Sequence, residues 1–162
     1  MTQEPKITAA LIYDFDGTLA PGNMQEYDFI PAVGQSNREF WNDANSLAEE
    51  QDADMTLTYM AKMLEAARSR KLSLRREAFQ ESGRRVTLFN GVREWFSRIN
   101  RYGEERGIRI LHYINSSGLK EIIEGTEIAH EFRKIYACSF LYDVDGIAYW
   151  PAVAVNYTNK TQ

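Results

Sequence analysis

The hydrophobic pattern of the chain begins with a short apolar run. Residues 7–13 (ITAALIY) are apolar at almost every position and show no helical period, and an acidic, glycine-containing segment follows at once. Such a run is typical of a parallel β-strand that is buried on both faces, and a buried core helix is the alternative. We therefore expect a strand here. A loop is expected over residues 21–31, which hold two prolines and a glycine.

Helical spacing of apolar residues dominates the next part of the chain. Ser36 and Glu39 have the spacing of a capping box, and apolar residues follow at intervals of three and four. Asp54 and Ser73 are candidate caps of a second and a third helix, and Gly91 precedes a fourth segment with one apolar face. The long segment after the first strand is therefore expected to be purely helical.

A second strand and a hairpin are predicted in the last third of the chain. Residues 108–114 (IRILHYI) favour a strand, residues 115–118 a turn, and residues 119–124 and 127–134 helices. The β-rich segments 135–142 and 147–155 flank Asp145-Gly146, a common hairpin turn pair. Strands that are separated by helices predict an α/β fold.

Composition places the chain among small globular proteins. Its 162 residues suggest one domain, or one core with a small inserted cap, and hydrophobic residues make up 44%. The net charge of -4 argues against a general nucleic-acid binder. The single cysteine, Cys138, excludes an internal disulfide and fits a reducing compartment. No apolar run is long enough to span a membrane. We expect a cytoplasmic protein without nucleic-acid or membrane partners.

The strongest chemical signal is Asp14-x-Asp16-Gly17-Thr18-Leu19, directly after the first strand. A carboxylate at the C-terminal end of a strand points into the crevice where open α/β sheets bind ligands. Asp14 can attack phosphorus and form an aspartyl-phosphate. Residues two apart on an extended chain point the same way, so Asp16 can protonate the leaving oxygen and later activate water. Gly17 permits the sharp turn.

This hexapeptide closely resembles the first motif of the haloacid dehalogenase (HAD) superfamily. The resemblance implies that Asp14 is the nucleophile, that Asp16 is the general acid/base, and that Gly17 and Thr18 help to bind phosphate. The dehalogenases lack an acid two residues after the nucleophile, so Asp16 favours phosphoryl transfer. Because two carboxylates repel a phosphate, we expect Mg²⁺ as cofactor, with Asp14 and the backbone carbonyl of Asp16 as ligands. An acidic turn after a strand is the alternative.

Two further segments fit the same resemblance. Ser116-Ser117-Gly118 follows the second strand, where hydroxyl and free backbone N–H groups can bind phosphate. Ser116 aligns with the second HAD motif and Ser117 is the alternative, while a turn that merely caps a helix is the simpler explanation. Lys160 has the position of the third-motif lysine, which neutralises nucleophile and phosphate, and a solvated tail lysine is the alternative.

The helical segment resembles the cap that is inserted after the first motif in the phosphoserine-phosphatase-like branch. We therefore expect a Rossmann-like HAD core with a parallel sheet, formed by residues 1–20 and 104–162. Residues 21–103 would form an α-helical cap. Trp41, Met60, Leu64, Trp95 and Phe96 are interpreted as interior packing of cap and core. The basic run within residues 68–76 is interpreted as a solvated helix face, or alternatively as an attraction for phosphate.

The fourth HAD motif, which completes the Mg²⁺ shell, has no counterpart in this sequence. In the superfamily its strand lies beside the first strand, so residues 7–13 would become an open apolar edge that invites association. We therefore expect a truncated form, or half of an assembly, with self-association through this edge.

The leading functional prediction is a Mg²⁺-dependent phosphomonoester hydrolase that acts on a small phosphorylated metabolite through an aspartyl-phosphate. One alternative is a non-catalytic HAD-like fragment that binds a phosphorylated ligand or partner. A second is a phosphotransferase or mutase, which would use the same intermediate. An acidic protein-interaction domain would leave the first motif unexplained.

Overall fold

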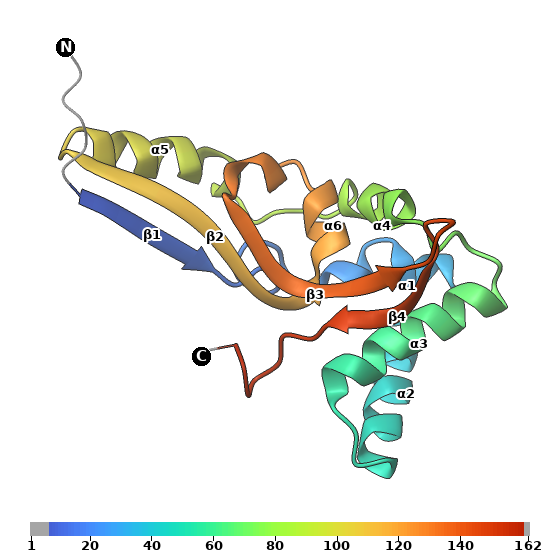
Figure 1. Cartoon of the computed structure of the whole chain (residues 1–162). Helices are drawn as coiled ribbons and strands as arrows, with labels where there is room; N and C mark the ends of the chain where they lie inside the picture. Colours follow the sequence, from blue (N-terminus) through green and yellow to red (C-terminus); the bar gives the residue numbers. More distant parts are fainter. Residues whose placement is uncertain (1–6, 161–162) are drawn as a thin grey trace.

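The computed structural model describes residues 7–160, whose strands form one four-stranded sheet with helices packed around it (Figure 1). The strands β1 (Ile7–Tyr13), β2 (Ile108–Leu119), β3 (Lys134–Tyr142) and β4 (Ala148–Val153) lie in this order. The pairs β1–β2 and β2–β3 are parallel, and β3–β4 is an antiparallel hairpin. The predicted α/β fold with a parallel sheet and a C-terminal hairpin is confirmed.

The strand β1 lies at the edge of this sheet and pairs with β2 along its whole length, from Ile7 opposite Ile108 to Tyr13 opposite Ile114. Ile7 is 60% exposed and Ile12 is 66% exposed. The expectation that this apolar run is buried on both faces is therefore wrong for the described structure. An edge strand has one bonded neighbour, and its apolar side chains stay accessible where no helix covers them.

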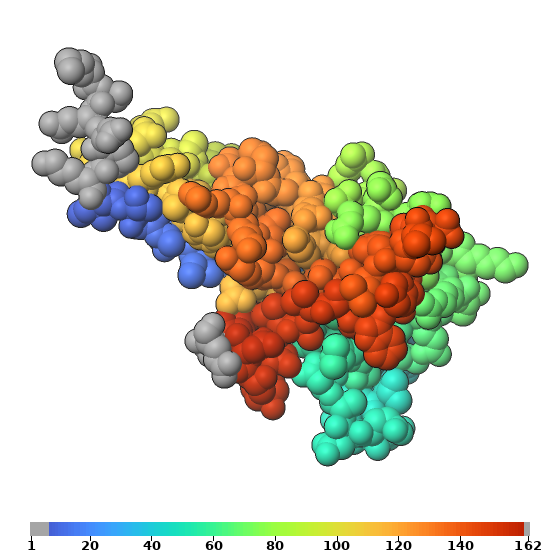
Figure 2. All heavy atoms as spheres, viewed as in Figure 1, coloured from blue at the N-terminus to red at the C-terminus, as the bar shows by residue number. Residues whose placement is uncertain are grey.

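Only helices connect β1 to β2 among the described elements, as the spacing predicts. They are η1 (Met24–Glu26), α1 (Phe29–Ala32), α2 (Asn37–Glu50), α3 (Met55–Ser69), α4 (Arg76–Gly83) and α5 (Val92–Glu104). Figure 1 shows that α5 lies along β2. In the α2–α3 pair, α3 packs against β4 and α2 extends away from the sheet. In Figure 2 the segment after β4 lies between this pair and the β1 side of the molecule. The division into core and cap at residues 21–103 stays a prediction.

Local capping signals place most helix starts correctly. Ser36 and Glu39 form the capping box of α2, and the Asp54 carboxylate accepts the Leu57 N–H at 2.9 Å to cap α3. Gly91 precedes α5 with φ 87°. The prediction for Ser73 is wrong, because α4 begins only at Arg76 and the Ser73 hydroxyl accepts the Arg75 N–H instead.

Two segments of the last third differ from the prediction. Residues 115–118 are not a turn but continue β2, because pairing with β3 extends to Leu119 opposite Cys138 across a bulge. Residues 127–134 are not a helix: they hold only the short η2 (Ala129–Glu131), and β3 already begins at Lys134. At the end of this segment the Arg133 N–H donates to the His112 carbonyl and Lys134 pairs with Tyr113, so contacts with β2 replace the helix there. The helix α6 (Lys120–Gly125) follows β2 directly.

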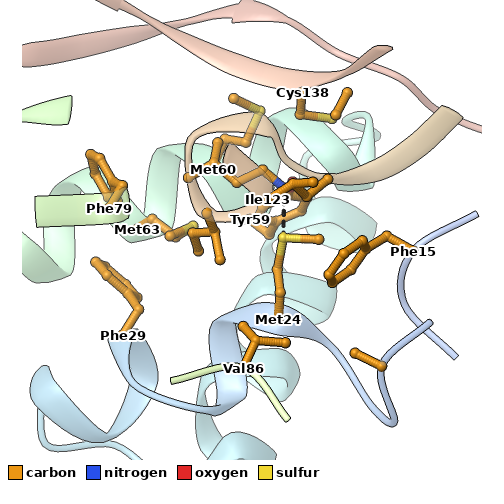
Figure 3. Close-up of a cluster of buried hydrophobic side chains, with 14 of the residues drawn as sticks. Phe15, Met24, Phe29, Tyr59, Met60, Met63, Phe79, Val86, Ile123 and Cys138 are labelled. Carbon is orange, nitrogen blue, oxygen red and sulfur yellow. Dashed lines mark hydrogen bonds between the residues drawn. The ribbon is translucent and has the colours of Figure 1, made fainter. Parts of the chain in front are cut away.

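A buried cluster beneath the ends of β1 and β2 joins the elements that form the site (Figure 3). Met24 and Phe15 are both fully buried, and the Met24 sulfur accepts the Leu119 N–H at 3.2 Å, the dashed line of Figure 3. Tyr59, Met60 and other side chains of α3 complete this cluster. In the described part of the chain, no helix has the length and apolarity that a membrane crossing requires.

Candidate active site

Asp14 lies directly after β1, and both of its carboxylate oxygens have partners. Oδ1 accepts the Phe15 N–H at 2.8 Å, and Oδ2 forms an ion pair with the Lys160 amine at 2.6 Å. The Asp14 side chain is 41% exposed, so this carboxylate remains accessible from the cavity. The fully buried Phe15 anchors the chain between Asp14 and Asp16.

The carboxyl group of Asp16 is enclosed by the surrounding chain, and its pKa is raised. Its Oδ1 accepts the Met24 N–H at 2.9 Å. The pKa of Asp16 is raised to about 7, chiefly by burial and also by the nearby charges of Asp14 and Glu26, while the Met24 N–H and Lys160 act in the opposite direction. A carboxyl group with this pKa is partly protonated near neutral pH, as a general acid must be.

The turn after Asp16 is formed by Gly17 and Thr18. Gly17 has φ 73°, which favours glycine, and its N–H donates to the Ala20 carbonyl at 2.8 Å. The N–H of Thr18 donates to the Phe15 carbonyl at 3.2 Å. Neither residue is among those that line the cavity at Asp14. Their predicted contact with phosphate therefore stays a prediction.

The end of β2 brings the second predicted segment to the same place. Ser116 is buried and its hydroxyl accepts the Gly118 N–H at 3.0 Å. The Ser117 carbonyl accepts the Tyr59 hydroxyl at 2.7 Å. A side chain at Gly118 would come within 2.9 Å of an Asp16 oxygen, so glycine allows β2 to approach Asp16 closely. Both serines line the cavity, so the choice between them stays open.

Lys160 belongs to a turn that other elements hold in place. Its N–H donates to the Asn156 carbonyl at 2.9 Å, and Asn115 donates to the Lys160 carbonyl. The Asn156 amide in turn donates to the Asp54 carboxylate at 2.7 Å, at the start of α3. These contacts direct the Lys160 amine to Asp14, and its side chain is only 26% exposed.

One cavity of about 330 Å³ unites these residues. Six of the eight predicted site residues line it: Asp14, Asp16, Ser116, Ser117, Gly118 and Lys160. Six further lining residues were not predicted as site residues: Asn23, Gln25, Trp41, Met55, Thr56 and Tyr59. Asn23 and Gln25 come from a segment that the sequence predicts to be a loop, and Trp41 from a helix face interpreted as interior. The hydrophobic periodicity of the sequence does not indicate that these residues lie on one cavity.

The basic run near the end of α3 lies elsewhere. Arg68 donates to the Tyr149 carbonyl at 3.3 Å and Arg75 to the Asp145 carbonyl, so both contact the hairpin of β3 and β4. Arg76 lies 3.7 Å from the buried Glu121. None of the three is among the residues that line the cavity.

The residues at Asp14 fit a magnesium ion of the kind that keeps several waters. Within residues 7–160 there is no group of three or more Asp, Glu, His or Cys side chains that could enclose a metal. Mg²⁺ is commonly bound by one or two carboxylates together with water and substrate phosphate. Asp14 and Asp16 both line the cavity, and Asp14 offers an accessible carboxylate, so the donor set meets this requirement.

Solved structures with a similar fold include a HAD family hydrolase and a phosphoserine phosphatase. A HAD family hydrolase from Salmonella enterica serovar Typhi matches with a TM-score of 0.65 and 13% identity, over 93% of this chain and 47% of that one. A phosphoserine phosphohydrolase-like protein from Francisella tularensis matches with a TM-score of 0.56 and 19% identity, over 91% and 64%. A phosphoserine phosphatase with a phospho-aspartyl intermediate analogue matches with a TM-score of 0.57 and 17% identity, over 88% and 61%.

The chain therefore has the fold of the HAD hydrolases, in the form found in phosphoserine phosphatases. The resemblance inferred from the first motif is confirmed at the level of the fold. In sequence, an uncharacterized protein of Borreliella burgdorferi is 33% identical over an alignment of 142 residues, and the match covers 82% of this chain. The chain spans about half the length of that relative, 50%. No family model matches the chain.

Proposed function

We propose that this protein is a Mg²⁺-dependent phosphomonoester hydrolase that acts through an aspartyl-phosphate on Asp14. The observation that carries the proposal is the meeting of Asp14, Asp16 and Lys160 with the serines at the end of β2 on one cavity. These residues come from distant parts of the chain, and the Asp14–Lys160 contact spans 146 positions. The fold shared with HAD hydrolases and phosphatases supports the same chemistry.

In the first half-reaction an Asp14 oxygen bonds to phosphorus while the bond from phosphorus to the ester oxygen breaks. Asp16 gives its proton to that oxygen, so that the product leaves as a neutral alcohol. The raised pKa of Asp16, about 7, supports this role, because the proton is present near neutrality. Ser116 or Ser117 and Lys160 would bind the oxygens of the transferred phosphoryl group.

In the second half-reaction Asp16 takes a proton from water, and the resulting hydroxide attacks the aspartyl-phosphate. The bond between phosphorus and the Asp14 oxygen breaks, which releases phosphate and restores the carboxylate. The Asp14 carboxylate and the Asp16 backbone carbonyl would hold Mg²⁺, which when bound neutralises negative charge between carboxylate and phosphate.

Hydrolysis of 4-nitrophenyl phosphate, with and without Mg²⁺, tests the proposal. We expect turnover that requires Mg²⁺ and falls by roughly a thousandfold or more with Asp14→Asn, because the nucleophile is lost. Asp16→Asn should lower kcat by roughly 10²–10⁴-fold, because the group that takes a proton from the attacking water is lost. The exposed Asp52, between α2 and α3, provides the matched control Asp52→Asn, which should retain full activity.

Mass spectrometry of acid-quenched reactions identifies the intermediate, which should place a phosphoryl group on Asp14. Turnover that survives Asp14→Asn would contradict the proposal. Binding of phosphate without any turnover would favour a non-catalytic phosphate-binding protein instead. Transfer of the phosphoryl group to an added alcohol, in preference to water, would favour a phosphotransferase.

A further inference from the structure

Gln25 is a buried polar side chain on the wall of the cavity that lacks a complete set of partners. It is 2% exposed, and its Oε1 has no hydrogen-bond partner within residues 7–160. It follows Met24, whose N–H holds the Asp16 carboxylate, so its backbone is fixed beside the proposed general acid. Buried polar groups nearly always have partners, and on a cavity wall a bound ligand or a water can supply the missing one.

The wall beside Gln25 is aromatic and held in a defined position. The Trp41 indole N–H donates to the Glu26 carboxylate at 2.7 Å, and the Asn23 amide donates to the same oxygen at 2.7 Å. Trp41 and Tyr59 meet edge to face with ring centroids 5.8 Å apart. Because Tyr59 is also tied to the Ser117 carbonyl, these rings form a fixed surface rather than a mobile one.

All charged side chains that line the cavity belong to the group around Asp14, where we propose that phosphate binds. Among the described residues that line it, only Asp14, Asp16 and Lys160 carry charge, and Lys160 is already paired with Asp14. The remaining polar lining side chains beyond the serines, on Asn23, Gln25 and Thr56, are neutral. A second anionic group on the substrate would thus be buried without a cation, which is strongly unfavourable.

We propose that Gln25 selects the substrate by hydrogen-bonding a hydroxyl group of the leaving alcohol, which is uncharged and polyhydroxylated, as in a sugar monophosphate. The apolar C–H face of such an alcohol packs on Trp41, and neutral side chains bind its hydroxyls. Phosphoserine is disfavoured, because its carboxylate would be buried without a cationic partner. This inference rests on the proposed phosphatase function.

The experiment compares kcat/KM for ribose 5-phosphate, phosphoserine and 4-nitrophenyl phosphate. The wild-type protein should prefer ribose 5-phosphate to phosphoserine by at least about tenfold. Gln25→Leu keeps the approximate volume but removes the amide, and should lower the ratio of kcat/KM for ribose 5-phosphate to that for 4-nitrophenyl phosphate by about 10–100-fold. The exposed Gln51 supplies the matched control Gln51→Leu, which should leave this ratio unchanged.

Thermal unfolding separates recognition from a structural role. Removal of an unpartnered buried amide should leave Tm equal to or higher than that of the wild type. A clearly lower Tm for Gln25→Leu would overturn the inference, because it would mean that the amide has its partner inside the protein. An unchanged substrate ratio, or a preference for phosphoserine, would also overturn it.

Failure of the proposed function is seen separately, as absence of wild-type turnover of 4-nitrophenyl phosphate. Calorimetry then measures the binding of ribose 5-phosphate to Asp14→Asn, in which one negative charge near the phosphate is removed. We expect Kd to rise about tenfold or more when Gln25→Leu is added. An equal Kd in both variants would reject the recognition by Gln25.

Discussion

Gly118 lies where the backbone of β2 passes closest to the side chains of the site. A methyl group at this position would lie 2.0 Å from the Met24 methyl carbon and 2.9 Å from an Asp16 oxygen. Met24 is fully buried beneath the site, so it cannot swing into solvent to make room. The missing side chain at residue 118 is thus a requirement of the site geometry rather than of a turn.

We predict that Gly118→Ala displaces Met24 or Asp16. Turnover of 4-nitrophenyl phosphate should fall at least about tenfold, and overpacking should cost about 1–3 kcal/mol of unfolding free energy. Gly107→Ala is the control. Gly107 has φ 68°, so alanine adds backbone strain there, but its methyl group would meet no atom within 4 Å and the residue does not line the cavity. It should lower stability while activity per folded molecule stays the same. Equal activity of both variants would contradict the prediction.

Glu121 is a second residue whose environment is unusual. It is fully buried on α6, and its Oε1 accepts the Phe140 N–H at 3.1 Å and the Tyr142 hydroxyl at 3.0 Å. Burial raises the pKa of Glu121 above its ordinary value of 4.5, although these hydrogen bonds and Arg76 act in the opposite direction. Through these hydrogen bonds, Glu121 links α6, the helix that follows the site, with β3.

This raised pKa predicts a pH dependence of stability. The folded protein retains the Glu121 proton where the unfolded chain has lost it, so the unfolding free energy should decrease as pH rises above 4.5. Glu121→Gln keeps an acceptor without a charge and should remove part of this slope in urea unfolding between about pH 5 and pH 8. The exposed Glu50 provides the control Glu50→Gln. Identical slopes in wild type and Glu121→Gln would refute the argument.

At the scale of elements, α4 and α6 approach each other backbone to backbone. A methyl group at Gly125 would lie 1.8 Å from the Gln80 carbonyl oxygen, and one at Gly83 would lie 2.0 Å from the Ile122 carbonyl oxygen. Because α6 continues directly from β2, this contact fixes the helix that follows Ser116 and Gly118. Gly83 and Gly125 therefore allow α6, the helix that follows the site, to pack closely against α4.

Gly125→Ala should destabilise the protein by about 3 kcal/mol or more, at the upper end of overpacking costs, because the clash is with backbone that cannot rotate away. Gly107→Ala, whose added methyl meets nothing within 4 Å, should cost only about 1 kcal/mol. Urea unfolding at neutral pH measures both values. The close-packing argument is wrong if the two substitutions cost the same.

The elements show which parts of the fold follow from local sequence. Ser36 with Glu39, and Asp54, act within one helical turn, so their capping could be predicted from neighbouring residues alone. The helix predicted at residues 127–134 is wrong. Residues 129–131 form only a short 3-10 helix, and Lys134 already pairs with Tyr113 in β2, which precedes α6 in the chain. A helical period in a short segment is a weak preference, and pairing with a strand already in place outweighs it.

At the scale of the whole molecule, the sheet leaves one edge and part of one face accessible. Ile12 is 66% exposed on β1, and with Tyr113 and Tyr136 it lines a broad hollow on the sheet. The edge of β1 that faces away from β2 has no strand beside it among the described residues. Apolar edges of this kind are prone to pairing with another chain.

We predict that the chain self-associates through β1. Size-exclusion chromatography at rising concentration should show a species larger than the monomer, and Ile12→Lys should restore the monomer, because a charge opposes edge pairing. Val144→Lys is the control, since Val144 is fully exposed in the hairpin turn, far along the chain from β1. A monomer at every concentration, with a cooperative melt, would count against the prediction.

The chemistry of the site and its assembly have different origins. Asp14 and Asp16 could be found from sequence because a strand end and a spacing of two residues place both carboxylates on one side through local geometry. The contact of Lys160 with Asp14 was suggested by the HAD resemblance, but it forms through anchors such as Asn156 with Asp54. The positions of Gln25 and Trp41 on the cavity, and the exposure of β1, depend on packing between segments far apart in the chain. Local sequence patterns do not predict such packing, because it depends on the sum of contacts across the folded molecule.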